Sequence, residues 1–126
     1  MHMPEQAQAD QLPVRKVLLV EDSEPDAVYV KRNLEQAFGH VEVTVACSLG
    51  EAFEAYKNDF FHLVLLDLNL PDAYGPSTVA EMRRFNKTIP IVAMTGMDAE
   101  MIKRPVLQNG ANRLILKEKL RDKDLK

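Results

Sequence analysis

The stretch LVLLDLNLPDAYG, residues 63–75, decides the fold of this chain. Its first four residues form a continuous apolar run, which is typical of a strand buried on both faces of a parallel sheet. The run ends at Asp67, and Pro71, Asp72 and Gly75 follow, so the chain turns directly after the strand. Asp67 is therefore predicted at the carboxyl end of a central strand, where open α/β sheets bind their ligands.

Length and composition limit the classes of protein to which the chain can belong. Its 126 residues give room for one domain, and 46% hydrophobic with 28% charged residues is ordinary for a globular protein. The net charge of −3 gives no general attraction to nucleic acid, and no apolar run is long enough to span a membrane. The one cysteine excludes an internal disulfide and favours a reducing compartment. We expect a cytoplasmic domain over residues 14–126, preceded by a disordered polar leader at residues 1–13.

Short apolar runs alternate with amphipathic stretches along the domain. Five strands are expected, at residues 17–20, 41–45, 63–67, 89–94 and 113–116. Ser23 and Ser48 each stand three residues before an acid, Asp26 or Glu51, which is the pattern of a helix N-terminus. Five βα units joined by right-handed crossovers predict a parallel sheet with helices on both of its faces.

The helices in the second half of the chain have less regular patterns. A helix beginning near residue 75 is predicted to turn three apolar side chains inward: Val79, Met82 and Phe85. The next helix, capped by Asp98, contains Pro105, which we expect to kink or split it. Only nine residues follow Lys117, so the last helix is expected to have about two turns.

Polar side chains stand at the ends of four of the predicted strands. They are Glu21 and Asp22 after the first strand, Asp67 at the end of the third, Thr95 after the fourth and Lys117 after the fifth. Because the carboxyl ends of parallel strands lie at one edge of the sheet, three carboxylates, a hydroxyl and an ammonium are expected to converge. Three acids in one pocket repel one another, so without a cation at least one of them would have a raised pKa.

A hard divalent cation removes that conflict. Carboxylate oxygens with a few waters suit Mg²⁺, which commonly binds one or two acids together with phosphate oxygens. A metal-bound acid beside a lysine and a hydroxyl is suited to a phosphoryl group, because both cations neutralise oxygen charge and the hydroxyl donates a hydrogen bond. Asp67 can itself be the nucleophile, since carboxylates form aspartyl phosphates.

Four motifs at compatible spacing resemble the CheY-like receiver domain of two-component response regulators. They are LLVEDS at residues 18–23, DLNLPDAYG at 67–75, AMTG at 93–96 and GANRLILK at 110–117. The resemblance covers residues 16 to about 120. It implies a flavodoxin-like, doubly wound α/β fold: a five-stranded parallel sheet in the order 2-1-3-4-5, flanked by helices, of which we expect the fourth kinked and the fifth shortened.

The resemblance also implies roles for particular residues. Asp67 resembles the phosphoacceptor, Thr95 the hydroxyl that moves toward the phosphoryl group, and Lys117 the lysine that pairs with that group. The implied Mg²⁺ site consists of Glu21, which would hold a metal-bound water, Asp22, Asp67 and the backbone carbonyl of Asn69. Asn69 and Met97 occupy positions that tune autodephosphorylation in such domains.

The implied function is transfer of a phosphoryl group from a sensor histidine kinase or a histidine phosphotransfer protein to Asp67. Such a domain catalyses only its own phosphorylation and dephosphorylation, so we expect no enzyme acting on other substrates. Signalling would pass through contact with a downstream protein, and a homodimer is among the expected assemblies. The pairs Arg83-Arg84 and Lys103-Arg104 are interpreted as exposed faces, too sparse to bind nucleic acid. The chain is either a stand-alone regulator or part of a longer one.

Four features depart from the family pattern. Leu114 stands where receivers usually carry Tyr or Phe, and Glu118 replaces the usual proline after the lysine. The geometry of the Lys117–Glu118 bond is therefore open, because a cis bond to a non-proline residue costs about 3 kcal/mol. Pro105 and the short last helix are the other two departures. All four lie on the face that many receivers use for output, so we hypothesise intact phosphorylation chemistry with a different output face.

Two alternatives belong to other classes of protein. A Mg²⁺-dependent phosphatase of the haloacid dehalogenase type also forms an aspartyl phosphate, but it needs a DxD arrangement at the first strand, where this chain has Glu21-Asp22. The second alternative is a pseudo-receiver, a binding module that is not phosphorylated. Leu114, Pro105 and Glu118 leave this alternative open.

Overall fold

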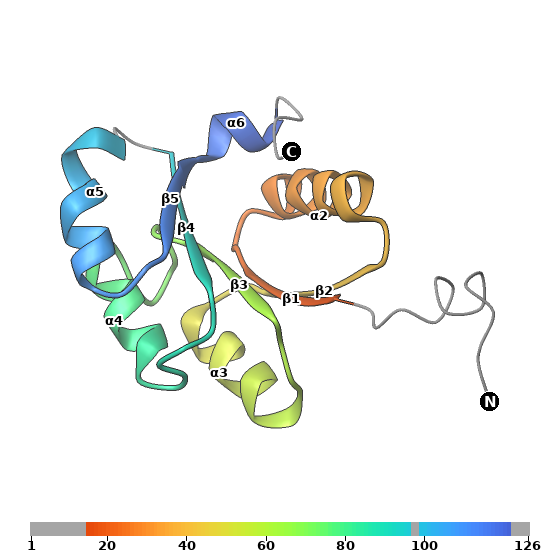
Figure 1. Ribbon diagram of the computed structural model, residues 1–126, viewed down its shortest axis with the longest axis horizontal. Coiled ribbons are helices and arrows are strands. Elements are labelled where there is room, and N and C mark those ends of the chain that lie inside the picture. Colours follow the sequence, from red (N-terminus) through yellow and green to blue (C-terminus); the bar gives the residue numbers. More distant parts are fainter. Residues whose placement is uncertain (1–14, 97–98, 122–126) are drawn as a thin grey trace, which may run out of the picture.

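Five parallel strands lie side by side in the order β2-β1-β3-β4-β5. The computed structural model describes residues 15–96 and 99–121, in which strands and helices alternate along the chain (Figure 1). The strands are β1 (Arg15–Val20), β2 (Val41–Ala46), β3 (Leu63–Asp67), β4 (Ile91–Thr95) and β5 (Arg113–Leu116). The helices are α2 (Glu24–Phe38), α3 (Leu49–Asn58), α4 (Ser77–Arg83), α5 (Ala99–Gln108) and α6 (Lys117–Arg121). The predicted parallel α/β sheet and its strand order are confirmed.

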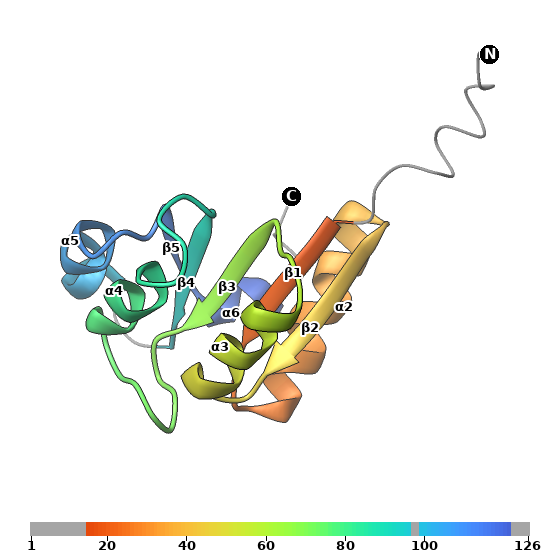
Figure 2. The ribbon, with the colours of Figure 1, turned by 90° about the horizontal axis from the view of Figure 1, so that it is seen from below.

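Helices cover both faces of the sheet. Seen from below, α3 and α4 lie in front of the strands, while α2 and α6 lie behind them (Figure 2). Each face has its own apolar core, because successive side chains of a strand point to opposite faces. One core joins Leu18 and Leu66 of the strands to Val79 and Met82 of α4, and the other joins Leu19 and Leu65 to residues of α2. Burying each such leucine or methionine contributes about 1.5–3 kcal/mol, so the central strands stabilise both layers.

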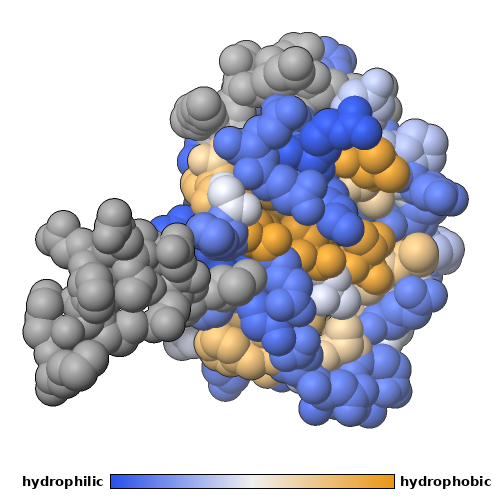
Figure 3. Space-filling model, turned by 90° about the vertical axis from the view of Figure 1, so that its right-hand side faces the viewer, coloured by the Kyte–Doolittle hydropathy of each residue, from blue (hydrophilic) through white to orange (hydrophobic). Residues whose placement is uncertain are grey.

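The strands differ in exposure according to their place in the sheet. In β3, between β1 and β4, the residues from Val64 to Asp67 are all buried. The edge strand β2 is half exposed, and Val45 retains 40% of its accessible surface. Hydrophobic side chains accordingly form a band among hydrophilic ones on the side of the molecule where β2 and α2 lie (Figure 3). None of the described helices is long and apolar enough to cross a membrane.

Side chains cap the first two helices as predicted. The Ser23 hydroxyl accepts a hydrogen bond from the backbone N–H of Asp26 at 3.4 Å, and the Ser48 hydroxyl accepts one from Glu51 at 3.1 Å. These contacts satisfy backbone donors that a helix leaves unpaired in its first turn. Because each capping serine follows a strand end by two or three residues, both helices begin at the edge of the sheet where the strands end.

Two expectations for the second half of the chain need correction. α5 runs as one helix with Pro105 inside it, so this helix is not split. The carbonyl that loses its donor belongs to Met101, which is 78% exposed, so water can replace the missing hydrogen bond. Phe85 is not on the inner face of α4, because the helix ends at Arg83; Phe85 is 42% exposed and stacks on Phe53 with ring centroids 3.9 Å apart.

The end of the described chain agrees with a short last helix. α6 spans five residues, Lys117–Arg121, within the described part of the chain. No peptide bond of the described residues is cis, so the bond between Lys117 and Glu118 is trans. The expected leader at residues 1–13, the cap at Asp98 and the tuning residue Met97 lie outside the described residues.

Arg83 is not an ordinary exposed residue, contrary to the sequence-based interpretation. Its guanidinium donates to the backbone carbonyls of Gly110, Asn86 and Ile89 at 2.9, 3.2 and 2.6 Å, and to the Asn112 side chain at 2.9 Å. This side chain therefore ties the end of α4 to the loops before β4 and β5. Gly110 has φ +115°, and a Cβ atom there would lie 2.9 Å from Cγ of Arg83.

We expect Gly110→Ala to lower the free energy of unfolding by about 1–3 kcal/mol, because alanine is strained at positive φ and would displace the Arg83 stem. Gly96→Ala is the matched control, since a Cβ atom there meets nothing within 4 Å. Urea unfolding of both variants measures the difference. Equal stability of Gly110→Ala and the wild type would show that this turn relaxes without cost.

Candidate functional site

The carboxyl ends of the strands bring the predicted acids together. One carboxylate oxygen from each of Glu21, Asp22 and Asp67 lies within 4.8 Å of the others. Glu21 and Asp67 are 1% exposed, whereas Asp22 is exposed. Backbone pairing fixes the two buried acids: the Glu21 N–H donates to the Ala46 carbonyl at 2.8 Å, and Asp67 is the last residue of β3.

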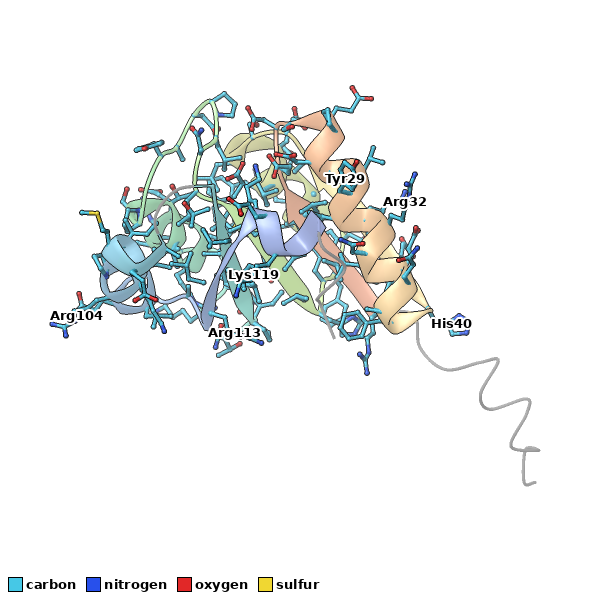
Figure 4. All side chains as sticks on the ribbon, turned by 90° about the horizontal axis from the view of Figure 1, so that it is seen from above. Tyr29, Arg32, His40, Arg104, Arg113 and Lys119 are labelled. Carbon is cyan, nitrogen blue, oxygen red and sulfur yellow. The ribbon has the colours of Figure 1, made fainter. Side chains whose placement is uncertain are left out.

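Lys117 is the cation of this site. Its ammonium lies 2.9 Å from Oε1 of Glu21, 2.8 Å from Oδ2 of Asp26 and 3.3 Å from Oδ2 of Asp67. The lysine reaches the acids because β5 ends directly before it and α6 begins with it. By contrast, the labelled side chains of Arg32, Arg104, Arg113 and Lys119 extend toward solvent, away from the strand ends (Figure 4).

Asp26 was missed as a site residue. The sequence shows it only as the acid of a capping pattern in the first turn of α2, which is a common place for an acid. Nothing in the helical period indicates that its side chain reaches a lysine 91 positions later, since that contact depends on how α2 packs against the start of α6. The side chain of Asp26 is 13% exposed, so the pair is largely removed from water.

Buried charge dominates the electrostatics. Burial, together with hydrogen bonding to Asp67, raises the pKa of Glu21 to about 7, against the opposing effect of Lys117. Burial alone would lower the pKa of Lys117, but the close contacts with Asp26 and Glu21 and the charge of Asp67 outweigh it and raise that pKa above its usual range. The positive charge of one ammonium therefore neutralises the negative charge of the surrounding acids only in part.

The site has an unsatisfied oxygen. Oε2 of Glu21 accepts a hydrogen bond from the Ser23 N–H at 3.2 Å, but Oε1 has no partner with hydrogen-bond geometry and is paired with Lys117 by charge alone. Crowded carboxylate oxygens with residual negative charge are the donor set that a hard divalent cation prefers. The residues present therefore fit such a cation.

The loop between β3 and α4 is held in place beside the acids. The Asn69 N–H donates to Oδ1 of Asp67 at 3.1 Å, and the Gly75 N–H donates to the Leu68 carbonyl at 2.8 Å. Farther along, the Asp72 carboxylate accepts hydrogen bonds from the N–H groups of Leu49 and Gly50, both at 2.9 Å, at the start of α3. The hydrogen bond from Leu49 is the main reason that the pKa of Asp72 lies below its usual range. The loop therefore keeps the Asn69 backbone next to Asp67.

A cavity of about 460 Å³ opens beside Asp67. It is lined by Asp67, Thr95 and Lys117 together with apolar groups of Leu68, Pro76 and Ile102. Thr95 is 4% exposed and comes from the end of β4, the neighbour of β3. All the side chains predicted at the strand ends thus belong to one connected region, in which Asp67 belongs both to the acidic cluster and to the cavity that Thr95 and Lys117 line. Such a region can hold a cation beside an anion.

An open parallel α/β sheet with an acidic site at the carboxyl ends of its strands is the class that fold and geometry define. Within that class, the response regulator receiver domain family matches residues 17–125, so the chain belongs to this family. Among curated relatives, the autoinducer 2 sensor kinase/phosphatase LuxQ of Vibrio vulnificus is 36% identical over 103 residues. That match covers 81% of this chain but only 12% of LuxQ.

Solved structures agree with the family. A CheY-like response regulator receiver domain protein from Methanospirillum hungatei superposes with a TM-score of 0.71 at 25% identity, covering 89% of this chain and 98% of that one. The Mn²⁺-bound form of the response regulator Rcp1 has a TM-score of 0.70 at 24% identity, covering 86% and 90%. At that identity the likeness to Rcp1 concerns the fold.

In the absence of divalent cations, we expect Glu21→Gln to stabilise the protein above neutral pH. The pKa of Glu21 is about 7 in the folded protein and about 4.3 when unfolded, so its contribution to stability is lost as the pH rises from about 4.3 through 7. The variant lacks this loss. Its advantage in the free energy of unfolding should be on the order of 1 kcal/mol at pH 5 and on the order of 3 kcal/mol at pH 8.

Urea unfolding in a chelator, at several pH values, measures this difference. Glu35→Gln, which removes an exposed acid of α2, is the control and should change little at any pH. A loss of stability in Glu21→Gln at pH 8 would instead show that attraction to Lys117 outweighs burial of the charge.

Proposed function

We propose that this chain accepts a phosphoryl group from a phosphohistidine on Asp67, with Mg²⁺ as the cofactor. The observation that carries the proposal is the position of Asp67: a buried carboxylate at the end of a central strand, beside a cavity and 3.3 Å from the Lys117 ammonium. Membership of the receiver family supports the same function.

In the proposed reaction, a carboxylate oxygen of Asp67 attacks the phosphorus atom. A P–O bond forms to Asp67 while the P–N bond to the imidazole breaks, and the imidazole keeps the electron pair and takes up a proton. Lys117 donates hydrogen bonds to the phosphoryl oxygens, where negative charge gathers. Because the lysine already lies against Oδ2 of Asp67, it needs no large movement to do so.

The acids account for the cofactor. Glu21, Asp22 and Asp67 would hold Mg²⁺, together with the backbone carbonyl of Asn69. When bound, Mg²⁺ offsets the negative charge of the carboxylates and of the phosphoryl oxygens. Without a cation, a phosphate dianion would have to approach buried carboxylates of the same sign.

Thr95 is proposed as the hydroxyl that donates a hydrogen bond to the phosphoryl group. It lies at the end of β4 and lines the same cavity as Asp67 and Lys117. The next residue, Gly96, also lines the cavity, and its missing side chain leaves room at the entrance. A moving threonine would change the surface near the start of α5, where a partner could detect it.

The proposal includes the domain's partners and its place in the cell. The phosphoryl donor is a sensor histidine kinase or a histidine phosphotransfer protein, and the receiver of the signal is a downstream protein. The domain acts catalytically on itself alone, in the cytoplasm. We also propose that the output face differs from that of other receivers, because Leu114 packs against the core where an aromatic residue is usual.

A pseudo-receiver that binds partners without being phosphorylated is the alternative. The absence of an aromatic residue at position 114 favours it, since that residue usually couples to the threonine. The acids, Thr95 and Lys117 favour a functional acceptor, and the two alternatives differ in one direct measurement.

We expect the wild-type protein to gain one phosphoryl group when incubated with acetyl phosphate and Mg²⁺, observed as intact mass. Asp67→Asn, and the wild type in a chelator, should gain none. Asp22→Asn should react at least tenfold more slowly at low Mg²⁺ because one cation ligand is lost. A short-lived adduct would escape detection, so binding of beryllofluoride, a phosphoryl analogue, is measured beside it. Absence of both the adduct and analogue binding would establish the pseudo-receiver.

A further inference from the structure

The ammonium of Lys117 has more carboxylate partners than phosphoryl chemistry needs. An ammonium has three N–H donors, and here Glu21, Asp26 and Asp67 surround it at 2.9, 2.8 and 3.3 Å. The contact with Asp26 is the shortest and that with Asp67 the longest. Asp26 comes from a helix, whereas the other two acids come from strand ends.

The first turn of α2 delivers Asp26 from a fixed position. The Asp26 N–H donates to the Ser23 hydroxyl at 3.4 Å, and the Ser23 N–H donates to Oε2 of Glu21 at 3.2 Å. The backbone that carries Asp26 is therefore tied to one of the site's own acids. α6, which begins with Lys117, lies on the same side of the sheet as α2 (Figures 1 and 2).

Phosphorylation of Asp67 would change only one of the three contacts. The Asp67 carboxylate would become an uncharged acyl group, and the negative charge would move to the phosphoryl oxygens. The lysine would then exchange its longest contact for a stronger one to those oxygens. Its contacts with Asp26 and Glu21 need not break.

We infer that Asp26 is a positioning residue that holds the Lys117 ammonium beside Asp67, ready to contact a phosphoryl group. This inference rests on the proposed function. A simpler role for Asp26 is that of an acid at a helix N-terminus. Glu24 lies in the same turn, carries the same charge and is exposed, with no lysine contact in the described structure. It provides a matched control for the simpler role.

The first experiment measures beryllofluoride affinity in the presence of Mg²⁺ by calorimetry. Asp26→Ala should bind the analogue about tenfold more weakly, because a charged hydrogen bond that places the lysine is lost. Asp26→Asn keeps the shape and one acceptor oxygen, so it should lose less and act as a partial rescue. Glu24→Gln should bind as the wild type does.

The second experiment needs no cofactor. In a chelator, each lysine is modified with an amine reagent, and peptide masses give the modification rates. Lys117 should react severalfold faster in Asp26→Ala than in the wild type, because the ammonium is less firmly held, whereas the exposed Lys119 should react equally in both. Glu24→Gln should leave the rate of Lys117 unchanged.

The outcomes separate the inference from the proposed function. If the wild type binds the analogue and both Asp26 variants match Glu24→Gln in affinity and reactivity, Asp26 does not position the lysine. Tighter analogue binding by Asp26→Ala would also overturn the inference, since Asp26 would then compete with the phosphoryl group. If the wild type neither binds the analogue nor is phosphorylated, the proposed function and the phosphoryl role of Asp26 are both overturned. Even then, the modification rate of Lys117 shows whether Asp26 holds the lysine.

Discussion

The site depends on one buried ammonium that offsets several carboxylates. Lys117 is 18% exposed and contacts Glu21, Asp26 and Asp67, and Asp22 lies beside them. Removing charges from water costs free energy that Coulomb attraction returns only where the geometry is good. Here the attraction does not fully offset the cost of burying the charges, as the raised pKa of Glu21 and its unsatisfied oxygen both show. The fold maintains this unfavourable arrangement because the central strands, buried on both faces, hold the acids rigidly.

The strand ends were the most predictable part of the molecule. A buried parallel strand is a continuous apolar run, so the residue that ends the run is visible in the sequence, as Asp67 is after residues 63–66. All strands of a parallel sheet place such residues at one edge. The convergence of Glu21, Asp22, Asp67, Thr95 and Lys117 followed from that rule, and the structure places them around one region.

Contacts that depend on how helices pack were not predictable. The sequence shows Asp26 as the acid of a capping pattern and Arg83 as an exposed residue. In the structure Asp26 reaches Lys117, and Arg83 reaches four partners across two loops. Phe85 continued the apolar spacing of α4, but the helix ends first. Pro105 lies within α5 without splitting it, because the carbonyl that loses its hydrogen bond is at an exposed residue. Periodicity gives the face of a helix, not its length or its long-range partners.

The same ammonium also links the site to the helices. Lys117 is the first residue of α6, and Asp26 lies in the first turn of α2, so their ion pair connects two helices on one face of the sheet. Thr95 leads from the site toward α5 on the opposite face. A change of charge at Asp67 would thus act on both faces of the sheet. It would act on one face through the contacts of Lys117, and on the other through the hydroxyl of Thr95.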